Sequence, residues 1–307
     1  MNESNLTYIL ISPARNESAL IEKTIQSVIK QTVLPLRWVI VNDGSTDNTS
    51  EIVRSYLADN PWIKLVDLPV RKERHFAAKV NAFNAGWDTV KNLDYQVIGN
   101  LDADVSFEPD YFEFLLDKMS EDSRLGVAGT IFMEEGYSSG KDSMEGQNHV
   151  AGAAQMFRRE CFDQIGGYLP NKAGGIDWIA VTTARMLGWK TRAFCEKSLF
   201  HYRKLGTAER NPLASSFSYG EKDYYLGNHP LWELFRVSYR LTKRPYLLNG
   251  MALGSGYLWA VVTRQKRPIS RELIKFHRQE EMHKLRSILG SLITFKRYRR
   301  FEPRPNE

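Results

Sequence analysis

Three apolar runs near the start of the chain each end on a short polar loop that carries carboxylates. The clearest run covers residues 95–101 and stops at Asp102-Ala103-Asp104. Between the runs, apolar residues recur every three or four positions, as they do in helices that bury one face. Strands that alternate with such helices predict a mostly parallel sheet with helices on its faces. The polar loops then lie at the carboxyl edge of the sheet, where open α/β folds bind ligands.

The same periodicities place the expected elements along the chain. Strands are expected at 8–11, 36–41, 63–66 and 97–101, and helices at 18–30, after residue 47 and at 76–90. Two further strands, at 126–132 and 150–157, flank a long polar loop at 134–148, and another helix ends near residue 188. We therefore expect one α/β domain over residues 1–205 and a helical, aromatic and basic extension over 206–307.

The extension carries most of the positive charge. From residue 231 onward there are 17 Lys and Arg against 6 Asp and Glu, whereas the first 230 residues carry 25 against 30. A helix is expected at 230–241, and the apolar stretch at 245–262 has basic residues on both sides. Since roughly 20 apolar residues are needed to span a bilayer, we interpret this stretch as an interfacial or shallowly inserted hairpin at an anionic membrane surface. The alternative is a helix packed on the first domain.

Two observations concern the location of the protein. Residues 1–7 have neither the basic nor the apolar segment of a signal peptide. Cys161 and Cys195 lie among apolar residues and have no spacing typical of disulfides or metal sites. We therefore expect a cytoplasmic protein, peripheral at the inner face of the plasma membrane. Nucleic acid is not an expected partner, because the acidic loops would repel its phosphates.

The order of the loop motifs resembles that of the family 2 glycosyltransferases. Pro-x-x-Asn-Glu stands at 13–17, Asp-Gly-Ser-Thr-Asp at 43–47 and Asp-x-Asp at 102–104. The resemblance covers residues 7 to about 205. It implies the GT-A fold, with a nucleotide-binding half at 7–120 and an acceptor half at 121–205. It also implies inverting transfer of a sugar from a nucleotide-sugar donor, with Mn²⁺ or Mg²⁺ as cofactor.

The resemblance assigns several residues to the donor. Pro13, Glu17 and Asp43 match the positions that line the family's nucleoside pocket. The carboxylates of Glu17 and Asp43 can accept hydrogen bonds from ribose hydroxyls or from a uracil-like N–H, and Arg15 can meet a phosphate. Lys79 stands where family members often carry Arg or Lys near the diphosphate. Taken singly, the two loops also fit plain structural roles, a helix cap and an ordinary turn.

The Asp-x-Asp motif is the expected metal site. Asp104 is the predicted ligand, and Asp102 is expected to contact ribose or a water molecule near the metal. His201 is a further candidate ligand, since a late histidine often completes the metal shell in GT-A enzymes. Its alternative is a structural role. The metal would act as a Lewis acid that neutralises charge on the departing diphosphate.

The predicted catalytic base is Asp177. The sequence Gly174-Gly175-Ile176-Asp177-Trp178 resembles the family's Glu-Asp motif, whose aspartate deprotonates the acceptor, but isoleucine replaces the glutamate. Without the resemblance, Asp177 would be interpreted as a helix N-cap. Gly175 and Trp178 are the candidate acceptor-binding residues, and Trp178 could equally pack in the core.

These assignments lead to one functional hypothesis and two alternatives. We expect transfer from a nucleotide sugar, with a UDP-sugar favoured, to a glycan or lipid-linked acceptor in bacterial exopolysaccharide or cell-envelope synthesis. One alternative is a non-catalytic sugar-nucleotide-binding subunit of a membrane assembly. The other is a sugar-1-phosphate nucleotidyltransferase, although the loop at 12–17 lacks the glycines that would cradle a triphosphate.

Overall fold

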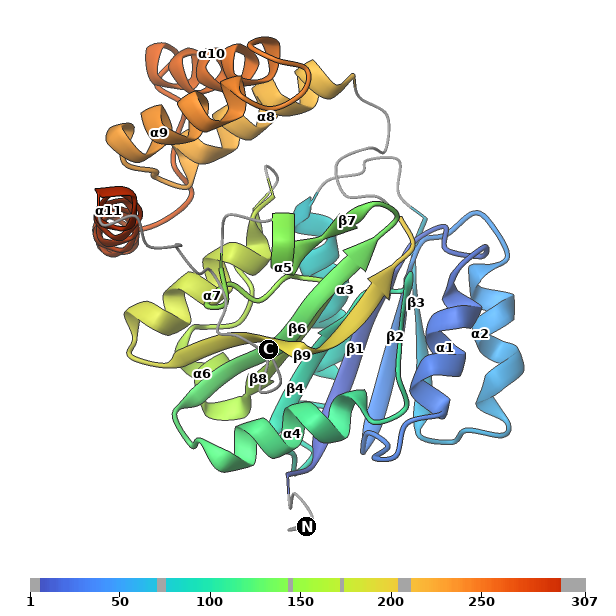
Figure 1. Cartoon of the computed structure of the whole chain (residues 1–307). Helices are drawn as coiled ribbons and strands as arrows, with labels where there is room; N and C mark the ends of the chain where they lie inside the picture. The colour runs from blue at the N-terminus through green and yellow to red at the C-terminus, as the bar shows by residue number, and fades with distance from the viewer. Residues whose placement is uncertain (1–5, 71–75, 143–145, 172–173, 204–210, 294–307) are drawn as a thin grey trace. The chain divides into compact units, whose positions relative to one another are not determined.

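The computed structural model describes residues 6–70, 76–142, 146–171, 174–203 and 211–293 (Figure 1). The chain divides into two compact units. Of the described residues, the first unit contains those up to 171 and 176–203, and the second contains 174–175 and 211–293. That this division also separates a glycosyltransferase domain from a membrane-associated extension, as expected for a boundary at 205, stays a prediction.

Within the described residues, a nine-stranded sheet forms the centre of the first unit. Its parallel half has the order β3 (Ile63–Leu68), β2 (Arg37–Asp43), β1 (Tyr8–Ala14) and β4 (Val97–Leu101). The mixed half continues with β8 (Ala154–Arg158), β6 (Leu125–Glu134), β9 (Lys190–His201) and β5 (Val105–Phe107), while β7 (Tyr137–Ser138) pairs with β6. Because the chain leaves β1 toward β2 and later returns to β4 on the other side of β1, the strand order reverses there. Such a crossover point is where α/β sheets bind ligands.

Helices cover both faces of the sheet because successive strand residues point to opposite sides. In β1, Tyr8 and Leu10 belong to one hydrophobic layer, whereas Ile9 and Ile11 belong to the other. The first layer includes α1 (Ile21–Ile29), α2 (Thr49–Leu57) and α4 (Tyr111–Glu121). The second includes α3 (Phe76–Asp88), α6 (Arg159–Gln164) and α7 (Ile176–Met186). The predicted mostly parallel sheet with flanking helices is confirmed.

Several elements differ from the expected bounds. The first helix begins at Ile21 rather than at residue 18, because hydrogen bonds hold the preceding loop to its neighbour. The strand expected at 150–157 begins only at Ala154, since the backbone turns just before it. The polar loop at 134–148 contains β7 and the short α5 (Ser139–Asp142). No strand is predicted from the sequence at the position of β9, because charged residues interrupt its apolar pattern.

The described part of the second unit consists of α8 (Pro212–Tyr225), α9 (Pro230–Leu241), α10 (Leu248–Val262) and α11 (Arg271–Ile293). The helix expected at 230–241 is confirmed by α9. Close packing joins α10 to α8, since a Cβ added at Gly256 would lie 2.0 Å from the carbonyl oxygen of Phe217. Among the helices described, none combines the length and the apolar character needed to cross a membrane.

A buried carboxyl group in α9 makes the stability of the chain depend on pH. Glu233 is 3% exposed, and burial, reinforced by the charge of Asp223, raises its pKa to about 8. An unfolded glutamate has its pKa near 4.5. The folded chain therefore binds this proton more tightly, and its unfolding free energy falls as the pH rises from 4.5 through about 8.

Glu233→Gln is expected to reduce this fall by at least about 1 kcal/mol, because glutamine stays neutral at every pH. The unfolding free energies of the two proteins should be similar at low pH and diverge at high pH. Urea unfolding, followed by circular dichroism on either side of the titration, measures both values. An equal fall in the wild type and the variant would contradict the assignment.

Candidate active site

Hydrogen bonds tie the first two polar loops to each other. The backbone amide of Asn16 donates to Ser45 Oγ (3.0 Å), and the backbone amide of Thr46 donates to Asn16 Oδ1 (2.8 Å). The Glu17 amide donates to Thr49 Oγ1 (2.8 Å). Asn16 has a φ of 55°, a left-handed conformation that asparagine tolerates better than most residues. The two motifs therefore form one connected corner at the ends of β1 and β2.

The residues predicted to bind the nucleoside lie in this corner. Pro13 is near the end of β1, and Asp43 is the buried last residue of β2. Gly44 follows with a φ of 65°, and a Cβ there would lie 2.7 Å from a carbonyl oxygen of the loop after β3. Arg15 is half-buried, and Glu17 is buried. The predicted residues thus share one edge of the sheet, and nucleoside binding by them stays a prediction.

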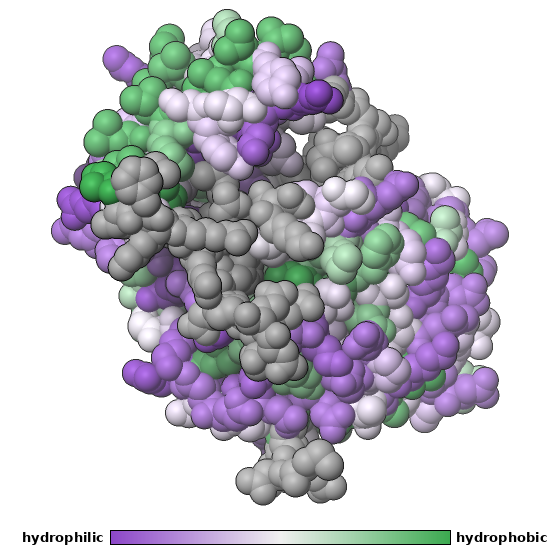
Figure 2. Space-filling view, in the orientation of Figure 1, coloured by the Kyte–Doolittle hydropathy of each residue, from purple (hydrophilic) through white to green (hydrophobic). Residues whose placement is uncertain are grey.

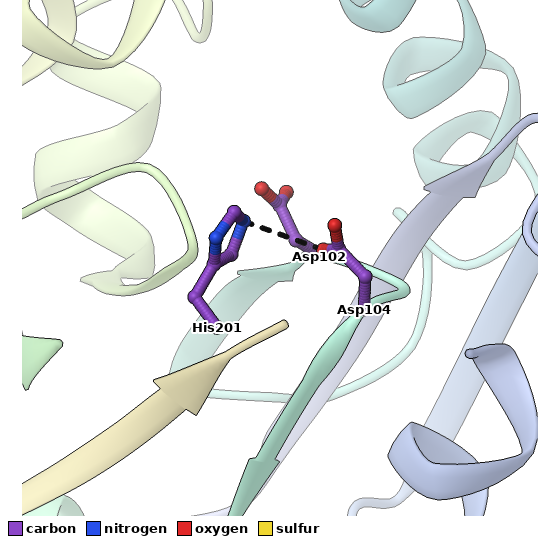
Figure 3. A group of neighbouring side chains, drawn as sticks. All are labelled: Asp102, Asp104 and His201. Carbon is purple, nitrogen blue, oxygen red and sulfur yellow. Dashed lines mark ion pairs between the residues drawn. The ribbon is translucent and has the colours of Figure 1, made fainter. Parts of the chain in front are cut away.

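Three side chains from two distant parts of the chain converge beyond β4 (Figure 3). Asp102, Asp104 and His201 each offer one ligand atom, and these atoms all lie within 4.8 Å of one another. His201 Nε2 is 3.5 Å from Asp104 Oδ1, and both side chains are buried. Carboxylates suit Mg²⁺ and Mn²⁺, and imidazole is a common ligand of transition metals. The donor set therefore fits a divalent cation.

The pairing of β5 with β9 delivers His201 to this cluster. His201 is opposite Val105 in the ladder, and the next amide, that of Tyr202, donates to the Asp104 carbonyl oxygen (3.0 Å). Behind the ring, His201 Nδ1 is 3.3 Å from Glu134 Oε1 at the end of β6, without the alignment of a hydrogen bond. An imidazole between a metal site and an outer carboxylate is the usual arrangement of a metal-binding histidine.

Glu134→Gln is expected to weaken Mn²⁺ binding by roughly 10- to 100-fold, because the outer carboxylate orients the ring and raises its basicity. Titration of the protein with Mn²⁺, followed by electron paramagnetic resonance, measures the dissociation constant. The exposed neighbour provides the control, since Glu135→Gln should leave Mn²⁺ binding unchanged. The same affinity in both variants would remove Glu134 from the site.

Arg203, which the sequence did not single out, connects the first loop to the carboxylate cluster. Its Nη2 is 2.6 Å from Glu17 Oε2, and its Nε is 3.9 Å from Asp104 Oδ2. Burial raises the pKa of Glu17 to about 7; Arg203 opposes this shift, while Asp104 and Asp102 add to it. Burial also raises the pKa of Asp104, and Asp102 adds to that shift. Carboxylates crowded in this way favour a bound cation.

Lys79 of α3 provides positive charge on another side of the cluster. Its Nζ is 2.5 Å from Asp102 Oδ1. Burial acts to lower the pKa of Lys79, but the charge of Asp102, with smaller contributions from Asp177 and Asp104, raises it overall. The lysine therefore remains protonated beside the Asp-x-Asp motif. Asp102 both belongs to the cluster with Asp104 and His201 and pairs with Lys79, while its predicted contact with ribose stays untested.

Asp177 lies against the turn at residues 152–153, which is hydrogen-bonded to the end of β4. A Cβ added at Gly152 would lie 3.2 Å from Asp177 Oδ2, so the carboxylate packs directly over this glycine. The Gly152 carbonyl oxygen accepts from Asn100 Nδ2 (2.7 Å), and the Ala153 carbonyl oxygen accepts from the Asp102 amide (2.9 Å). Gly152 therefore contributes to the site. The sequence did not indicate this role, because residues 150–157 are small and apolar and were expected to form a strand throughout.

The residues beside Asp177 in the sequence lie just before α7 or in its first turn. Gly175 has a φ of 75°, which suits glycine. Ile176 is buried in a hydrophobic layer, so the position where the family pattern has a glutamate serves packing here. Trp178 is only 8% exposed, which favours the packing alternative, and its contact with an acceptor stays a prediction. Asp177 is the second residue of α7 and thus lies inside the helix, beyond the N-cap.

Comparison with solved structures identifies the class of fold. A mannosyltransferase from Pyrobaculum calidifontis, solved with GDP-Man and Mn²⁺, matches with a TM-score of 0.53 at 16% identity, over 94% of this chain and 88% of that one. GalNAc-T7, solved with UDP, GalNAc and Mn²⁺, matches with a TM-score of 0.59 at 15% identity, over 94% and 57% of the two chains. The protein thus has the GT-A fold of the glycosyltransferases.

Sequence comparison identifies the family. The family model described as glycosyl transferase family 2 matches residues 9–172, just over half of the chain. The chain belongs to this family, which confirms the resemblance of its motifs. A chondroitin synthase of Pasteurella multocida is 33% identical over 118 residues, and a poly-β-1,6-N-acetyl-D-glucosamine synthase of Staphylococcus epidermidis is 32% identical over 112. These matches cover 38% and 36% of this chain but only 11% and 25% of those synthases.

Proposed function

We propose that the chain is a metal-dependent, inverting glycosyltransferase that uses a nucleoside-diphosphate sugar, with a UDP-sugar favoured. Its acceptor would be a glycan or a lipid-linked intermediate of exopolysaccharide or cell-envelope synthesis. The observation that carries this proposal is the convergence of Asp104, His201 and Asp177 with two cationic side chains at the crossover point of a family 2 fold. The polysaccharide synthases among the relatives support this choice of acceptor.

The corner at the ends of β1 and β2 would hold the nucleoside. Glu17 and Asp43 offer acceptors for ribose hydroxyls and for the N–H of a uracil ring, and this is the reason to favour UDP. Lys79 and Arg203 would bind diphosphate oxygens. In the structure, Lys79 pairs with Asp102 and Arg203 pairs with Glu17. On binding the donor, each cation would exchange its carboxylate for phosphate oxygens. Solved structures of the same fold contain GDP-Man in one case and UDP in another, so the nucleotide needs a direct test.

Asp104 and His201, together with Asp102, would hold the metal. The imidazole ligand favours Mn²⁺ over Mg²⁺, because Mg²⁺ prefers oxygen ligands. When bound, the ion neutralises charge that develops on the leaving diphosphate. The protein's own contribution is to fix these ligands, since strand pairing positions His201 and Glu134 supports its ring.

Asp177 would act as the general base. The acceptor hydroxyl oxygen attacks C1 of the sugar, the bond from C1 to the diphosphate oxygen breaks, and the carboxylate of Asp177 takes the hydroxyl proton. One displacement of this kind inverts the configuration at C1. An ordinary aspartate has a pKa of about 4 and is a weak base, so the proton leaves late, when the new C–O bond is already forming.

We also propose that the protein works in the cytoplasm at the inner face of the plasma membrane. The excess of basic residues in the second unit supports contact with an anionic surface. Of the two alternative functions, the non-catalytic binding subunit is kept as an outcome of the mutational test of Asp177. The nucleotidyltransferase is set aside because residues 9–172 match the family model described as glycosyl transferase family 2.

The proposed activity is tested by incubating the protein with single nucleotide sugars and Mn²⁺. The expected result is release of one nucleoside diphosphate, accelerated by a membrane or glycan fraction as acceptor, and lost when EDTA is added. Nuclear magnetic resonance of the product should show the opposite anomeric configuration to that of the donor. Retained configuration would exclude the single displacement, and failure to turn over any nucleotide sugar with the acceptor fraction would contradict the proposal.

A further inference from the structure

Apart from Asn249 and the exposed Ser255, the helix α10 carries apolar or aromatic side chains and glycines, although only part of it is covered. Its covered stripe packs within the second unit and consists of Gly250, Leu253, Gly256, Tyr257 and Ala260. A second stripe has side chains that are between 52% and 76% exposed, and it consists of Leu248, Met251, Leu258, Trp259 and Val262. A helix that is apolar all round is typical of a protein core or of contact with a membrane. We therefore expect the exposed stripe to contact a partner.

The turn before α10 extends this apolar surface. Tyr246 and Leu247 are 60% and 61% exposed, and both directly precede the helix. We call these two residues and the exposed stripe of α10 the docking face. Among the described residues, ten of the twenty exposed large hydrophobic side chains lie between 231 and 262. Figure 2 shows hydrophobic residues gathered on the surface of this part of the chain. A patch of this kind marks an interaction surface.

Positive charge borders the docking face at both ends. Exposed Lys243 and Arg244 stand before it, and exposed Arg264 and Lys266 follow it. Between residues 234 and 271 the sequence has eight Lys and Arg and no Asp or Glu. Arg244 also lies over the ring of Tyr246, with its guanidinium 5.9 Å from the ring centre. The surroundings of the docking face thus favour an anionic partner.

We propose that the docking face binds the surface of an anionic lipid bilayer, with α10 lying in the interface. A helix of 15 residues is roughly 22 Å long, too short for an apolar core of roughly 30 Å. Tyr246 and Trp259 are of the type that settles at the headgroup level, and the basic ends match anionic lipids. A second copy of the chain fits less well, because a symmetric dimer would bring these positive ends together. The proposal rests on the membrane location proposed above, for which it names the contact surface, and does not depend on the transfer chemistry.

Flotation of the full-length chain with lipid vesicles tests this proposal. The chain should bind vesicles that contain phosphatidylglycerol in phosphatidylcholine much more strongly than pure phosphatidylcholine, and high salt should weaken the binding. Lys243→Gln/Arg244→Gln should lower the partition coefficient by roughly 25-fold, since each charge near an anionic surface contributes roughly fivefold. Leu258→Gln/Trp259→Gln should lower it by at least roughly tenfold through lost apolar burial.

Matched substitutions in the first unit provide the controls. Leu187 is 46% exposed, so Leu187→Gln removes a comparable apolar side chain, and Lys30→Gln/Lys64→Gln removes two exposed charges. Neither should change vesicle binding. Quenching of tryptophan fluorescence by brominated lipid should be strong in the wild type and reduced in Trp259→Phe. Circular dichroism and nucleotide binding of every variant identify misfolding or a failed donor site separately.

Three results would overturn the proposal. The first is no binding to anionic vesicles, and the second is binding that neither double variant weakens. The third is a concentration-dependent dimer that light scattering detects and Leu258→Gln/Trp259→Gln abolishes, without vesicle binding. That last result would assign the docking face to a second copy of the chain.

Discussion

Asp177→Asn is expected to lower kcat for sugar transfer by roughly 10²- to 10⁴-fold, the usual contribution of a general base. Asparagine keeps the size of the side chain, so its packing over Gly152 is retained, but the amide cannot take the acceptor proton. The affinity for the nucleoside diphosphate should change by less than about threefold, which corresponds to less than about 0.7 kcal/mol in binding free energy. Steady-state kinetics and calorimetry on the same preparations measure the two quantities.

The control for this variant is Asp163→Asn, which removes an exposed carboxylate in α6 and should leave kcat unchanged. Transfer by Asp177→Asn at the wild-type rate would contradict the role of Asp177 as the base. If the wild type binds the donor but transfers to no acceptor, the chain is the non-catalytic binding subunit. In that case the structural interpretation of Asp177, as part of the first turn of α7, is the correct one.

Asp104→Ala is expected to weaken Mn²⁺ binding by more than about 100-fold, beyond the loss typical of an outer carboxylate. Transfer activity should fall with it. Asp104 is 6% exposed and faces His201 and Arg203, so its loss removes a ligand and leaves Arg203 without one of its two acidic neighbours. Mn²⁺ titration and the rate of transfer measure the two effects.

Two further variants separate this effect from misfolding. Asp104→Asn keeps the shape of the side chain and should also bind Mn²⁺ weakly. Asp59→Ala changes an exposed carboxylate after α2, near the amino end of β3, and should behave as the wild type. Unchanged Mn²⁺ affinity in Asp104→Asn, with unchanged thermal unfolding, would exclude Asp104 as a metal ligand.

The sequence predicts the half of the site that depends on local structure. Asp102 and Asp104 follow an apolar strand directly, and strand ends in a parallel sheet meet at one edge, so their position can be derived from periodicity. The same holds for Glu17 and Asp43 at the ends of β1 and β2. His201 was proposed only by resemblance, and the structure brings it to the two aspartates.

The rest of the site depends on pairings that have no local signal. Arg203 reaches Glu17 across 186 residues of sequence, and Glu134 meets His201 only because β6 and β9 run side by side. The register of β9 decides which side chains face the site, and its interrupted apolar pattern hides even the strand. Gly152 was hidden for a related reason, because a turn of small residues has the same composition as a buried strand.

We expect the nucleotide site to depend on a metal held at Asp104 and His201. Calorimetric titration of the wild type with UDP, GDP, dTDP and CDP, each with and without Mn²⁺, measures this dependence. One nucleotide, with UDP favoured, should bind only when Mn²⁺ is present. Equal binding with and without Mn²⁺, or binding of none of the four, would contradict it.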